Sequence, residues 1–325
     1  MTSRFVIVGA GAVGGVVGGL LARSGADTLL VARGDHARAI AANGLIVATP
    51  SGTTRIDVPV TDEPPDALAI GEGDVVLLAV KSQDTEAVVR GLAATAPPDT
   101  PVACLQNGLA NERAVLRRFE HVLGVTVMLP AAYLQPGAVV AYSAPVPGIL
   151  DVGRVPSGSS EAGERLAAAL TRAGFSSRFL DDIERWKRRK LLANLGNAVQ
   201  TLCGSAAAAP RLLERVRGEG EAALAAAGLS VVGIDEYDAR RAGVVTPGRV
   251  AGASRPGSST AQSLARGATS VETDYLNGEV VLLGRLHGVA VDANALVVRL
   301  MRELLANPGR AGTLSEEAIL AQLPR

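Results

Sequence analysis

The stretch Phe5-Val6-Ile7-Val8-Gly9-Ala10-Gly11-Ala12-Val13-Gly14 decides the fold. Four strand-forming residues lead directly into a G-x-G-x-x-G pattern. The eighteen residues from 5 to 22 contain no charged residue and six glycines. The segment is therefore also compatible with a signal peptide or a membrane span, and its GxxxG spacings would suit a transmembrane helix dimer.

The residues that follow favour a nucleotide-binding loop over both alternatives. Residues 27–32 form another strand-like run, so the order is strand, glycine turn, helix, strand. In such a βαβ unit Gly9 permits the tight turn, Gly11 lets the backbone approach a pyrophosphate, and Gly14 lets the helix pack closely on the sheet. A helix that had to stand alone would lose about 1 kcal/mol at each interior glycine. We therefore expect a dinucleotide site, with the helix N-terminus facing the phosphates.

Composition limits the class of protein. The chain has 325 residues, 48% of them apolar, and a mean hydropathy of +0.25, so it is long enough for two domains and is not disordered. Lys plus Arg and Asp plus Glu balance at 32 each, which argues against a nucleic-acid partner. Cys104 and Cys203 lie far apart in apolar runs and are expected as free thiols in a reducing compartment. The three histidines show no metal-ligand spacing. We expect a cytoplasmic protein with no metal and no membrane partner.

The end of the second strand bears on the choice of cofactor. An NAD site usually carries an acidic residue there for the ribose 2′-hydroxyl. Here Arg33 occupies that place, and Arg38 follows close by. A guanidinium can bind a 2′-phosphate through two hydrogen bonds, which favours NADP. Asp35 keeps NAD open, and a surface arginine after a strand is the plain alternative.

The character of the chain changes near residue 180. Before it, strand-like runs alternate with helical ones, including a nearly continuous apolar strand at 74–80. Beyond it, residues 182–202, 211–227, 230–242, 262–267, 271–286 and 293–306 all favour helix. The predicted fold class is α/β, with a Rossmann-type dinucleotide-binding domain at 1–180 followed by an all-α domain at 181–325 that binds substrate and carries the chemistry.

Two polar residues follow strand ends, where open α/β sheets bind ligands. Lys81 follows one predicted strand and Asn107 another. Each has a plain alternative, because Lys81 suits an exposed loop and Asn107-Gly108 is a good turn.

The segment Trp186-Lys187-Arg188-Arg189-Lys190 opens a predicted helix that runs on to Asn194 and Asn197. Lys190, Asn194 and Asn197 fall at i, i+4 and i+7, on one face. A lysine beside two amides would suit a general acid and a held substrate. The preceding Lys187, Arg188 and Arg189 are predicted to form a solvated basic face, and Trp186 to pack.

A third group lies nearer the C-terminus. Ser258 and Ser259 precede a short helical run, and Glu272 falls in the first turn of the helix predicted at 271–286. Thr269 and Glu272 have the spacing of a capping box, which would explain Glu272 without a functional role. The apolar face of that helix, which includes Leu282 and Leu286, is predicted to face the core.

Over nearly its whole length the chain resembles the ketopantoate reductase (2-dehydropantoate 2-reductase) family. The matching pieces are Gly9-Ala10-Gly11-Ala12-Val13-Gly14, Lys81-Ser82-Gln83-Asp84, Gln106-Asn107-Gly108, Lys190-Leu191-Leu192-Ala193-Asn194 and Glu272-Thr273-Asp274-Tyr275-Leu276-Asn277-Gly278. The resemblance implies NADPH as cofactor, Lys190 as general acid, Glu272 and Ser258 or Ser259 as substrate contacts, and Asn107 and Asn194 near substrate and nicotinamide. It also places Lys81 and Arg33 near the cofactor.

Two spacings depart from the family pattern. The second asparagine, Asn197, lies seven residues after Lys190 where eight is common, and the Ser-to-Glu interval is one residue longer. Asn197 is therefore a candidate substrate contact that could favour another 2-oxo acid.

The predicted activity is reduction of 2-dehydropantoate to pantoate with NADPH. Two alternatives stay open. One is a sibling reductase of another small branched 2-oxo acid, and the other is an NADP-sensing protein without turnover. A small 2-oxo acid is the expected partner, and a homodimer is compatible with the sequence.

Overall fold

The computed structural model describes residues 3–251 and 257–324, and these form two compact units. The first unit contains residues 1–106, 111–187 and 234–255, and the second contains 107–110, 188–233 and 256–325, apart from the few residues that the structure does not describe. The predicted division at 180/181 differs from these units mainly at two segments. Residues 107–110 belong to the helical unit, and the described residues 234–251 return to the α/β unit.

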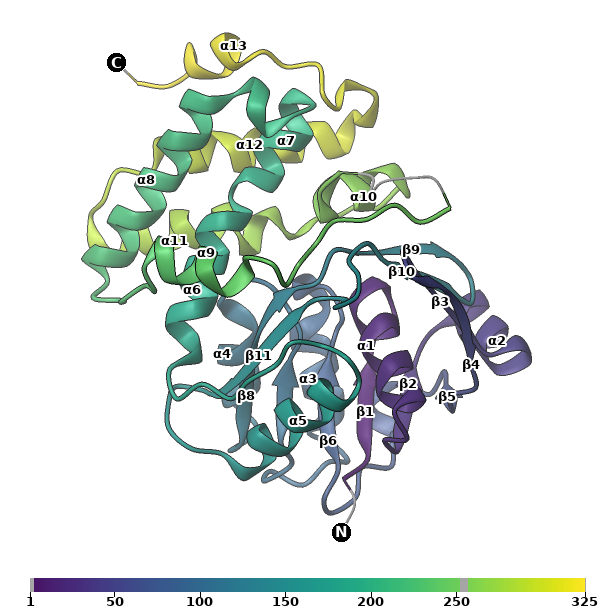
Figure 1. The fold of residues 1–325 in the computed structure, drawn as a ribbon. Coiled ribbons are helices and arrows are strands. Elements are labelled where there is room, and N and C mark those ends of the chain that lie inside the picture. Colours follow the sequence, from purple (N-terminus) through teal and green to yellow (C-terminus); the bar gives the residue numbers. More distant parts are fainter. Residues whose placement is uncertain (1–2, 252–256, 325) are drawn as a thin grey trace. The chain divides into compact units, whose positions relative to one another are not determined.

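The first unit holds the strands and the helices packed on them (Figure 1). Its elements are β1 (Phe5–Val8), α1 (Ala12–Arg23), β2 (Thr28–Val31), α2 (Gly34–Asn43), β3 (Leu45–Thr49), β4 (Gly52–Ile56), β5 (Val60–Thr61), η1 (Pro65–Ala67), β6 (Val75–Leu78), η2 (Ser82–Asp84), α3 (Thr85–Leu92), β7 (Val102–Cys104), β8 (Val122–Met128), β9 (Ala131–Gln135), β10 (Ala138–Ala141), β11 (Ile149–Arg154), α5 (Glu161–Arg172) and α9 (Ile234–Arg241). Helix α4 (Ala110–Leu116) lies almost wholly in this unit.

Two sheets organise this unit. The larger has the strand order β11-β8-β7-β6-β1-β2-β5 and is parallel except for β11, which pairs antiparallel with β8. The smaller has the order β4-β3-β10-β9. A parallel sheet of short apolar strands, entered through a glycine turn, is the predicted Rossmann-type arrangement.

Helix α1 packs against both sheets, and this explains its glycine spacing. A Cβ on Gly18 would lie 2.4 Å from the Leu30 side chain, on the larger sheet. A Cβ on Gly19 would lie 2.9 Å from the Leu45 side chain, on the smaller one. The GxxxG spacings therefore serve close packing inside a domain. In the described part of the chain, no helix combines the length and apolar character needed to cross a membrane.

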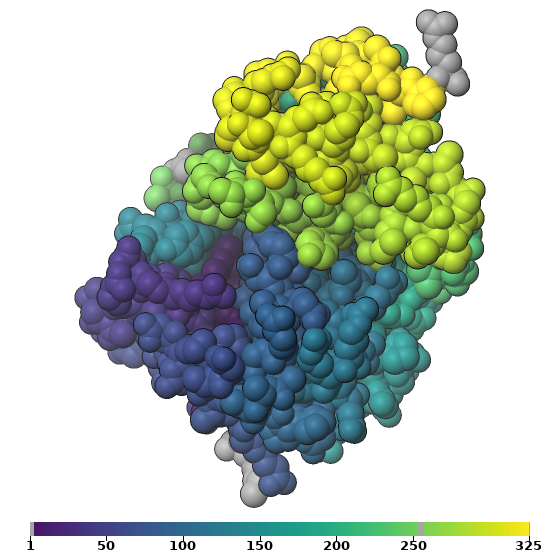
Figure 2. Space-filling view, turned by 180° about the vertical axis from the view of Figure 1, so that it is seen from behind, coloured from purple at the N-terminus to yellow at the C-terminus, as the bar shows by residue number. Residues whose placement is uncertain are grey.

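The second unit is helical and has its own apolar core. Its elements are α7 (Gly196–Cys203), η3 (Ala206–Ala208), α8 (Pro210–Ala226), α10 (Ser259–Ala265), η4 (Glu272–Tyr275), α11 (Asn277–His287), α12 (Asp292–Ala306), η5 (Pro308–Arg310) and α13 (Glu316–Leu320). Leu109 packs in this core with side chains of α6 (Ile183–Asn194) such as Leu191, and so residues 107–110 belong here. In the view from behind, the surface of this unit consists largely of residues from α11 onward (Figure 2).

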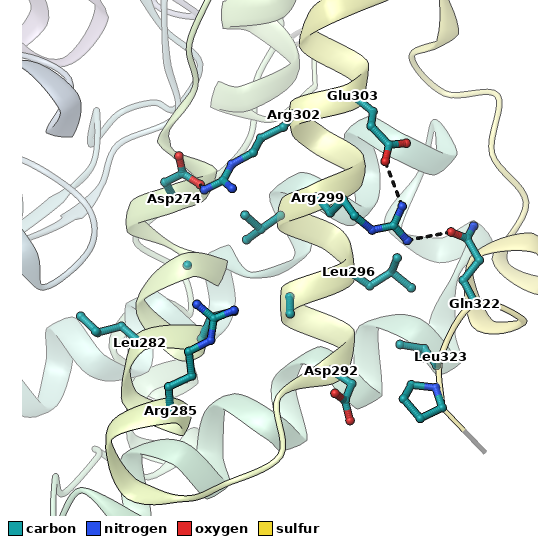
Figure 3. Close-up of a pocket in the computed structure, with 15 residues that line it drawn as sticks. Asp274, Leu282, Arg285, Asp292, Leu296, Arg299, Arg302, Glu303, Gln322 and Leu323 are labelled. Carbon is teal, nitrogen blue, oxygen red and sulfur yellow. Dashed lines mark hydrogen bonds and ion pairs between the residues drawn. The ribbon is translucent and has the colours of Figure 1, made fainter.

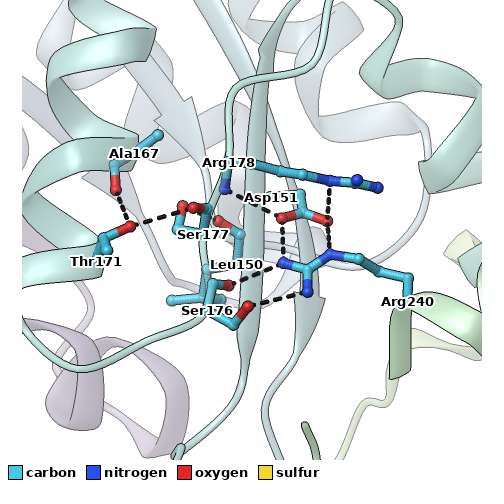
Figure 4. Close-up of polar contacts among 8 residues, drawn as sticks. All are labelled: Leu150, Asp151, Ala167, Thr171, Ser176, Ser177, Arg178 and Arg240. Atoms are coloured by element: carbon cyan, nitrogen blue, oxygen red, sulfur yellow. Dashed lines mark hydrogen bonds and ion pairs between the residues drawn. The ribbon is translucent and has the colours of Figure 1, made fainter. Parts of the chain in front are cut away.

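Residues 234–251 belong to the first unit because polar and aromatic contacts of α9 fix them there. Asp151, which is completely buried on β11, accepts hydrogen bonds from Arg240 Nη2 at 2.7 Å and Nε at 2.8 Å (Figure 4). Trp186 packs near Tyr237 with ring centroids 6.4 Å apart. Nothing in the local sequence of α9 reveals these partners, since they lie far away along the chain.

The predicted helix at 182–202 is two helices. Helix α6 ends at Asn194 and α7 begins at Gly196. The predicted helix at 271–286 is likewise divided into the 3-10 helix η4 and α11. Both cysteines are free, and burial raises the pKa of each thiol, most strongly at Cys104.

Candidate active site

The first unit contains the predicted nucleotide cradle between β1 and α1. Gly9 has φ +101°, and a Cβ there would lie 2.9 Å from the backbone nitrogen of Val80. A Cβ on Gly14 would lie 2.1 Å from the carbonyl oxygen of Gly9, so only glycine fits. A Cβ on Gly11 would meet no atom within 4 Å, so the backbone there borders open space. Ala12 and Val13 form the first turn of α1, whose free N–H groups can bind phosphate.

A cavity of about 600 Å³ adjoins this cradle. Gly9, Ala10 and Gly11 line it together with Arg33, which is exposed at the N-cap of α2. The cradle and the cavity fit the nucleotide part of a dinucleotide, and Arg33 lines the same cavity.

Two acidic residues that the sequence analysis did not consider line the same cavity. Asp62 and Glu63 follow β5, which pairs with β2 and so ends beside Arg33. Asp35, which kept NAD open, forms an ion pair with Arg38. The charge around the expected ribose site is therefore mixed.

His36 is another cavity residue that the sequence analysis missed. Its Nε2 lies 2.7 Å from the Ala10 carbonyl oxygen, and Gly137 N–H donates to Nδ1 at 2.9 Å. This pattern requires a neutral imidazole that carries its proton on Nε2. Burial lowers the pKa of His36, and the bond to the Ala10 carbonyl partly opposes that shift. The ring thus ties α2 to the cradle.

Lys81 and Asn107 stand after neighbouring strands of the larger sheet. Lys81 follows β6 and is half-buried, at the N-cap of η2. Asn107 follows β7 and is also half-buried. The Gln106 side chain links the two strand ends, because its Nε2 donates to the Val80 carbonyl at 2.9 Å and to Thr85 Oγ1 at 2.8 Å.

The second unit contains the predicted substrate residues that lie on α6, α7, α10 and η4. Lys190 is half-buried and Asn194 is buried, one turn apart on α6 as predicted. The Nδ2 of Asn194 is buried and has no hydrogen-bond partner among the described residues. A buried amide donor of this kind fits a contact to a ligand oxygen.

Asn197 belongs to the next assigned helix. It lies on α7, after Leu195, and its side chain is half-buried. Its carbonyl oxygen accepts hydrogen bonds from Thr201 Oγ1 at 2.8 Å and from Ser258 Oγ at 3.4 Å. Leu195 keeps helical dihedral angles (φ −56°, ψ −29°), and its N–H donates to the Leu191 carbonyl at 3.1 Å, so the i+7 alignment of Asn197 with Lys190 stays a prediction.

Ser258 is the N-cap of α10, and its Oγ accepts a hydrogen bond from Ala261 N–H at 3.3 Å. Its hydroxyl therefore has a structural use. Ser259 is the first residue of that helix and is half-buried.

Glu272 is buried in η4, and the predicted capping box does not form. The N-cap of η4 is Val271, which makes no side-chain cap, and α11 begins only at Asn277. Gly108 lies against the same segment, since a Cβ there would be 2.9 Å from the Tyr275 carbonyl oxygen. The turn that carries Asn107 therefore packs on the segment that carries Glu272.

The predicted solvated face of α6 is wrong. Lys187 is 4% exposed and Arg188 is 8% exposed. Arg188 donates to the Ser230 carbonyl at 3.0 Å, and Arg189 donates to the Val232 carbonyl at 2.8 Å. Each cation has a fixed partner on a segment distant in sequence, which local charge patterning cannot reveal.

A separate groove of about 800 Å³ lies between α11, α12 and the C-terminal residues (Figure 3). There Arg302 pairs with Asp274 at 2.9 Å, and Arg299 bonds Glu303 at 2.9 Å and Gln322 at 3.0 Å. Leu282 is 46% exposed and Leu286 is 68% exposed, so the prediction that this face of α11 lies in the core is wrong.

Within the described residues, no group of three or more His, Cys, Asp or Glu side chains is placed to hold a metal ion.

The Rossmann-type sheet, the glycine cradle and the helical unit define a dinucleotide-binding oxidoreductase. The family model described as "Ketopantoate reductase PanE/ApbA" matches residues 5–156, and that of its C-terminal part matches residues 182–305. The chain belongs to the ketopantoate reductase family, whose members act on a CH–OH/C=O group.

Curated relatives agree. The chain is 34% identical to the 2-dehydropantoate 2-reductase of Halobacterium salinarum, over 95% of this chain and 100% of the relative. It is 32% identical to that of Archaeoglobus fulgidus, over 92% of this chain and 97% of the relative.

Solved structures show the same fold. A PanE/ApbA family ketopantoate reductase from Ralstonia eutropha superposes with a TM-score of 0.78 and 29% identity, covering 94% of this chain and 100% of that one. A D-mandelate dehydrogenase, solved with NADH and anilino(oxo)acetate, shares the fold with a TM-score of 0.79 and 22% identity, covering 94% and 99%.

Proposed function

We propose that this protein reduces 2-dehydropantoate to pantoate with NADPH. The observation that carries this proposal is the buried Asn194 Nδ2 without a partner in the described part of the chain, one helical turn from Lys190. The amide can donate to a substrate oxygen without adding charge, and the lysine can supply a proton. The names of the curated relatives support the choice of substrate.

Apart from the hydride, which the cofactor supplies, each chemical role is assigned to a residue of this chain. When bound, the reduced nicotinamide supplies a hydride to the keto carbon. Lys190 stabilises the negative charge that develops on the keto oxygen and donates the proton that completes the alcohol. Asn194 and Asn107 orient the substrate, and Glu272 binds its polar groups together with Ser258 or Ser259 at the N-terminus of α10.

The preference for NADPH is proposed from Arg33. Its guanidinium lines the cavity beside the cradle and can form two charge-assisted hydrogen bonds to a 2′-phosphate. Asp62 and Glu63 oppose this preference, because their carboxylates line the same cavity and repel a phosphate.

One observation favours a second substrate class. Asn197 lies on α7, seven residues after Lys190, where eight is the common spacing in the family. A different arrangement of substrate contacts would suit another branched 2-oxo acid, or an aryl 2-oxo acid such as the one related to mandelate, given the D-mandelate dehydrogenase that shares this fold.

The test is a steady-state assay of NADPH oxidation. Purified protein is supplied with 2-dehydropantoate, with other branched 2-oxo acids and with phenylglyoxylate. The highest kcat/KM is expected for 2-dehydropantoate. A higher value for another 2-oxo acid would reassign the substrate, and absence of turnover with all of them would favour the sensor alternative.

A further inference from the structure

Lys187, on α6, is a buried cation that forms an ion pair with Glu112, and both residues belong to the first unit. Its Nζ lies 2.7 Å from Glu112 Oε1, with 3% and 4% of the two side chains exposed. The same ammonium donates to the Gln106 carbonyl at 2.8 Å and to the Val125 carbonyl at 3.3 Å. A lysine so buried is costly unless its charge is paired and its donors are used; here Glu112 supplies the opposite charge and two backbone carbonyls accept hydrogen bonds from the ammonium.

The sheet is shaped to receive this side chain. Gly124 on β8 pairs with Gly153 on β11. A Cβ on Gly124 would lie 3.1 Å from Lys187 Cδ, and a Cβ on Gly153 would lie 2.6 Å from Ile183 Cβ. Because Ile183 and Lys187 are one turn apart on α6, the paired glycines form a notch for the start of that helix.

The Gln106 carbonyl belongs to the peptide plane that joins Gln106 to Asn107. A hydrogen bond to this carbonyl therefore restricts the rotation of the peptide plane, which also contains the backbone nitrogen of Asn107. The Gln106 side chain acts in the same way on the neighbouring strand, because it donates to the Val80 carbonyl, in the peptide before Lys81. One chain of contacts thus runs from Lys187 through Gln106 to the two loops that carry candidate site residues.

We propose that Lys187 is a positioning residue of this active site. It fixes the peptide that carries Asn107 and anchors the first turns of α6, the helix on which Lys190 follows three residues later. Glu112 holds the ammonium in place. The proposal rests on the proposed function, since it assigns Asn107 and Lys190 to the reaction.

The test compares Lys187→Met with Arg240→Met. Methionine matches the lysine side chain out to Cε and removes only the ammonium with its donors. Arg240 is a matched control, because its ion pair with the buried Asp151 stabilises the same unit away from the cradle and the strand-end loops. We expect kcat of Lys187→Met to fall about 10²-fold, the loss that a small misplacement of reacting groups produces, while the Kd for NADPH changes less than about twofold. Arg240→Met should lower Tm and leave kcat unchanged.

Two further measurements separate positioning from folding. The double variant Lys187→Met/Glu112→Leu removes the unpaired carboxylate, so it should recover Tm and keep the low kcat. Backbone hydrogen exchange at residues 106–109 should quicken in both Lys187 variants and stay unchanged in Arg240→Met.

The outcomes distinguish the two proposals. An inactive wild-type protein would overturn the proposed function, and the exchange at residues 106–109 would still test whether Lys187 holds this peptide. An active wild type with unchanged kcat in Lys187→Met would overturn the positioning role. Recovery of kcat together with Tm in the double variant would also overturn it, because it would show a purely structural contribution.

Discussion

The imidazole of His36 is bonded to the carbonyl oxygen of Ala10, in the centre of the nucleotide cradle, at 2.7 Å. The other ring nitrogen, Nδ1, accepts a hydrogen bond from Gly137 N–H, so a proton added to Nδ1 would point at another donor and break that bond. Since burial lowers the pKa of His36 below its ordinary value, the unfolded chain takes up this proton first as the pH falls.

The His36 pair predicts a pH dependence of stability. The stabilisation is fully present above the ordinary pKa of about 6.5 and is lost as the pH falls from there toward the folded pKa. Between about pH 7 and pH 5.5, Tm of the wild type should fall further than Tm of His36→Gln, which cannot titrate. Parallel pH profiles from calorimetry on the two proteins would contradict the assignment.

The Asp151–Arg240 pair predicts a stability loss. Arg240→Met leaves the completely buried Asp151 with Arg178, whose backbone N–H donates to Oδ1 at 3.2 Å and whose Nε lies 3.6 Å from Oδ2. Breaking a buried pair costs about 3–5 kcal/mol, and the remaining arginine places this case toward the lower value. Denaturant unfolding measures it. A change below about 1 kcal/mol would show that Asp151 is not charged and buried as described.

Arg33 predicts the cofactor preference. Wild-type protein should bind NADPH more tightly than NADH, and Arg33→Ala should remove most of the difference, roughly tenfold to a hundredfold for a contact of about 1.5–3 kcal/mol. Titration with each cofactor gives the two Kd values. Arg38→Ala is the control, because that side chain is exposed and paired with Asp35. Asp62→Asn should strengthen the preference, and equal Kd values in the wild type would contradict the prediction.

Lys190 predicts the largest catalytic loss. Lys190→Ala should lower kcat by about 10²–10⁴, the range of an acid–base group, and still bind NADPH. Arg185→Ala is the control on the same helix, since that side chain is 40% exposed and its nearest acid, Asp182, lies 3.9 Å away. Similar losses in both variants, or none in Lys190→Ala, would mean that another group supplies the proton.

The variant Glu272→Gln tests whether the Glu272 carboxylate binds substrate or stabilises the fold. No capping box uses its carboxylate, so Glu272→Gln should raise KM or lower kcat with little change in Tm. Kinetics equal to those of the wild type would return Glu272 to a structural role.

Much of the dinucleotide site could be predicted from the sequence by itself. The strand, the glycine turn and α1 follow one another along the chain, and each depends on local backbone conformation and hydrogen bonding. The spacing of Lys190 and Asn194 is equally local, and it survives because α6 runs unbroken from Ile183 to Asn194. The GxxxG spacings were visible too, although only the two sheets show which surfaces these glycines meet.

The remaining features were decided by tertiary structure. Lys187 has the sequence context of a solvated basic run, yet it is buried because Gly124 leaves room for it and Glu112 supplies the opposite charge. Residues 234–251 return to the first unit because Arg240 pairs with Asp151, 89 positions away. Whether a charged or an apolar helix face is buried depends on residues distant in sequence. The favourable free energy of contacts with those residues exists only in the folded chain, so helical periodicity could not predict the burial of the face.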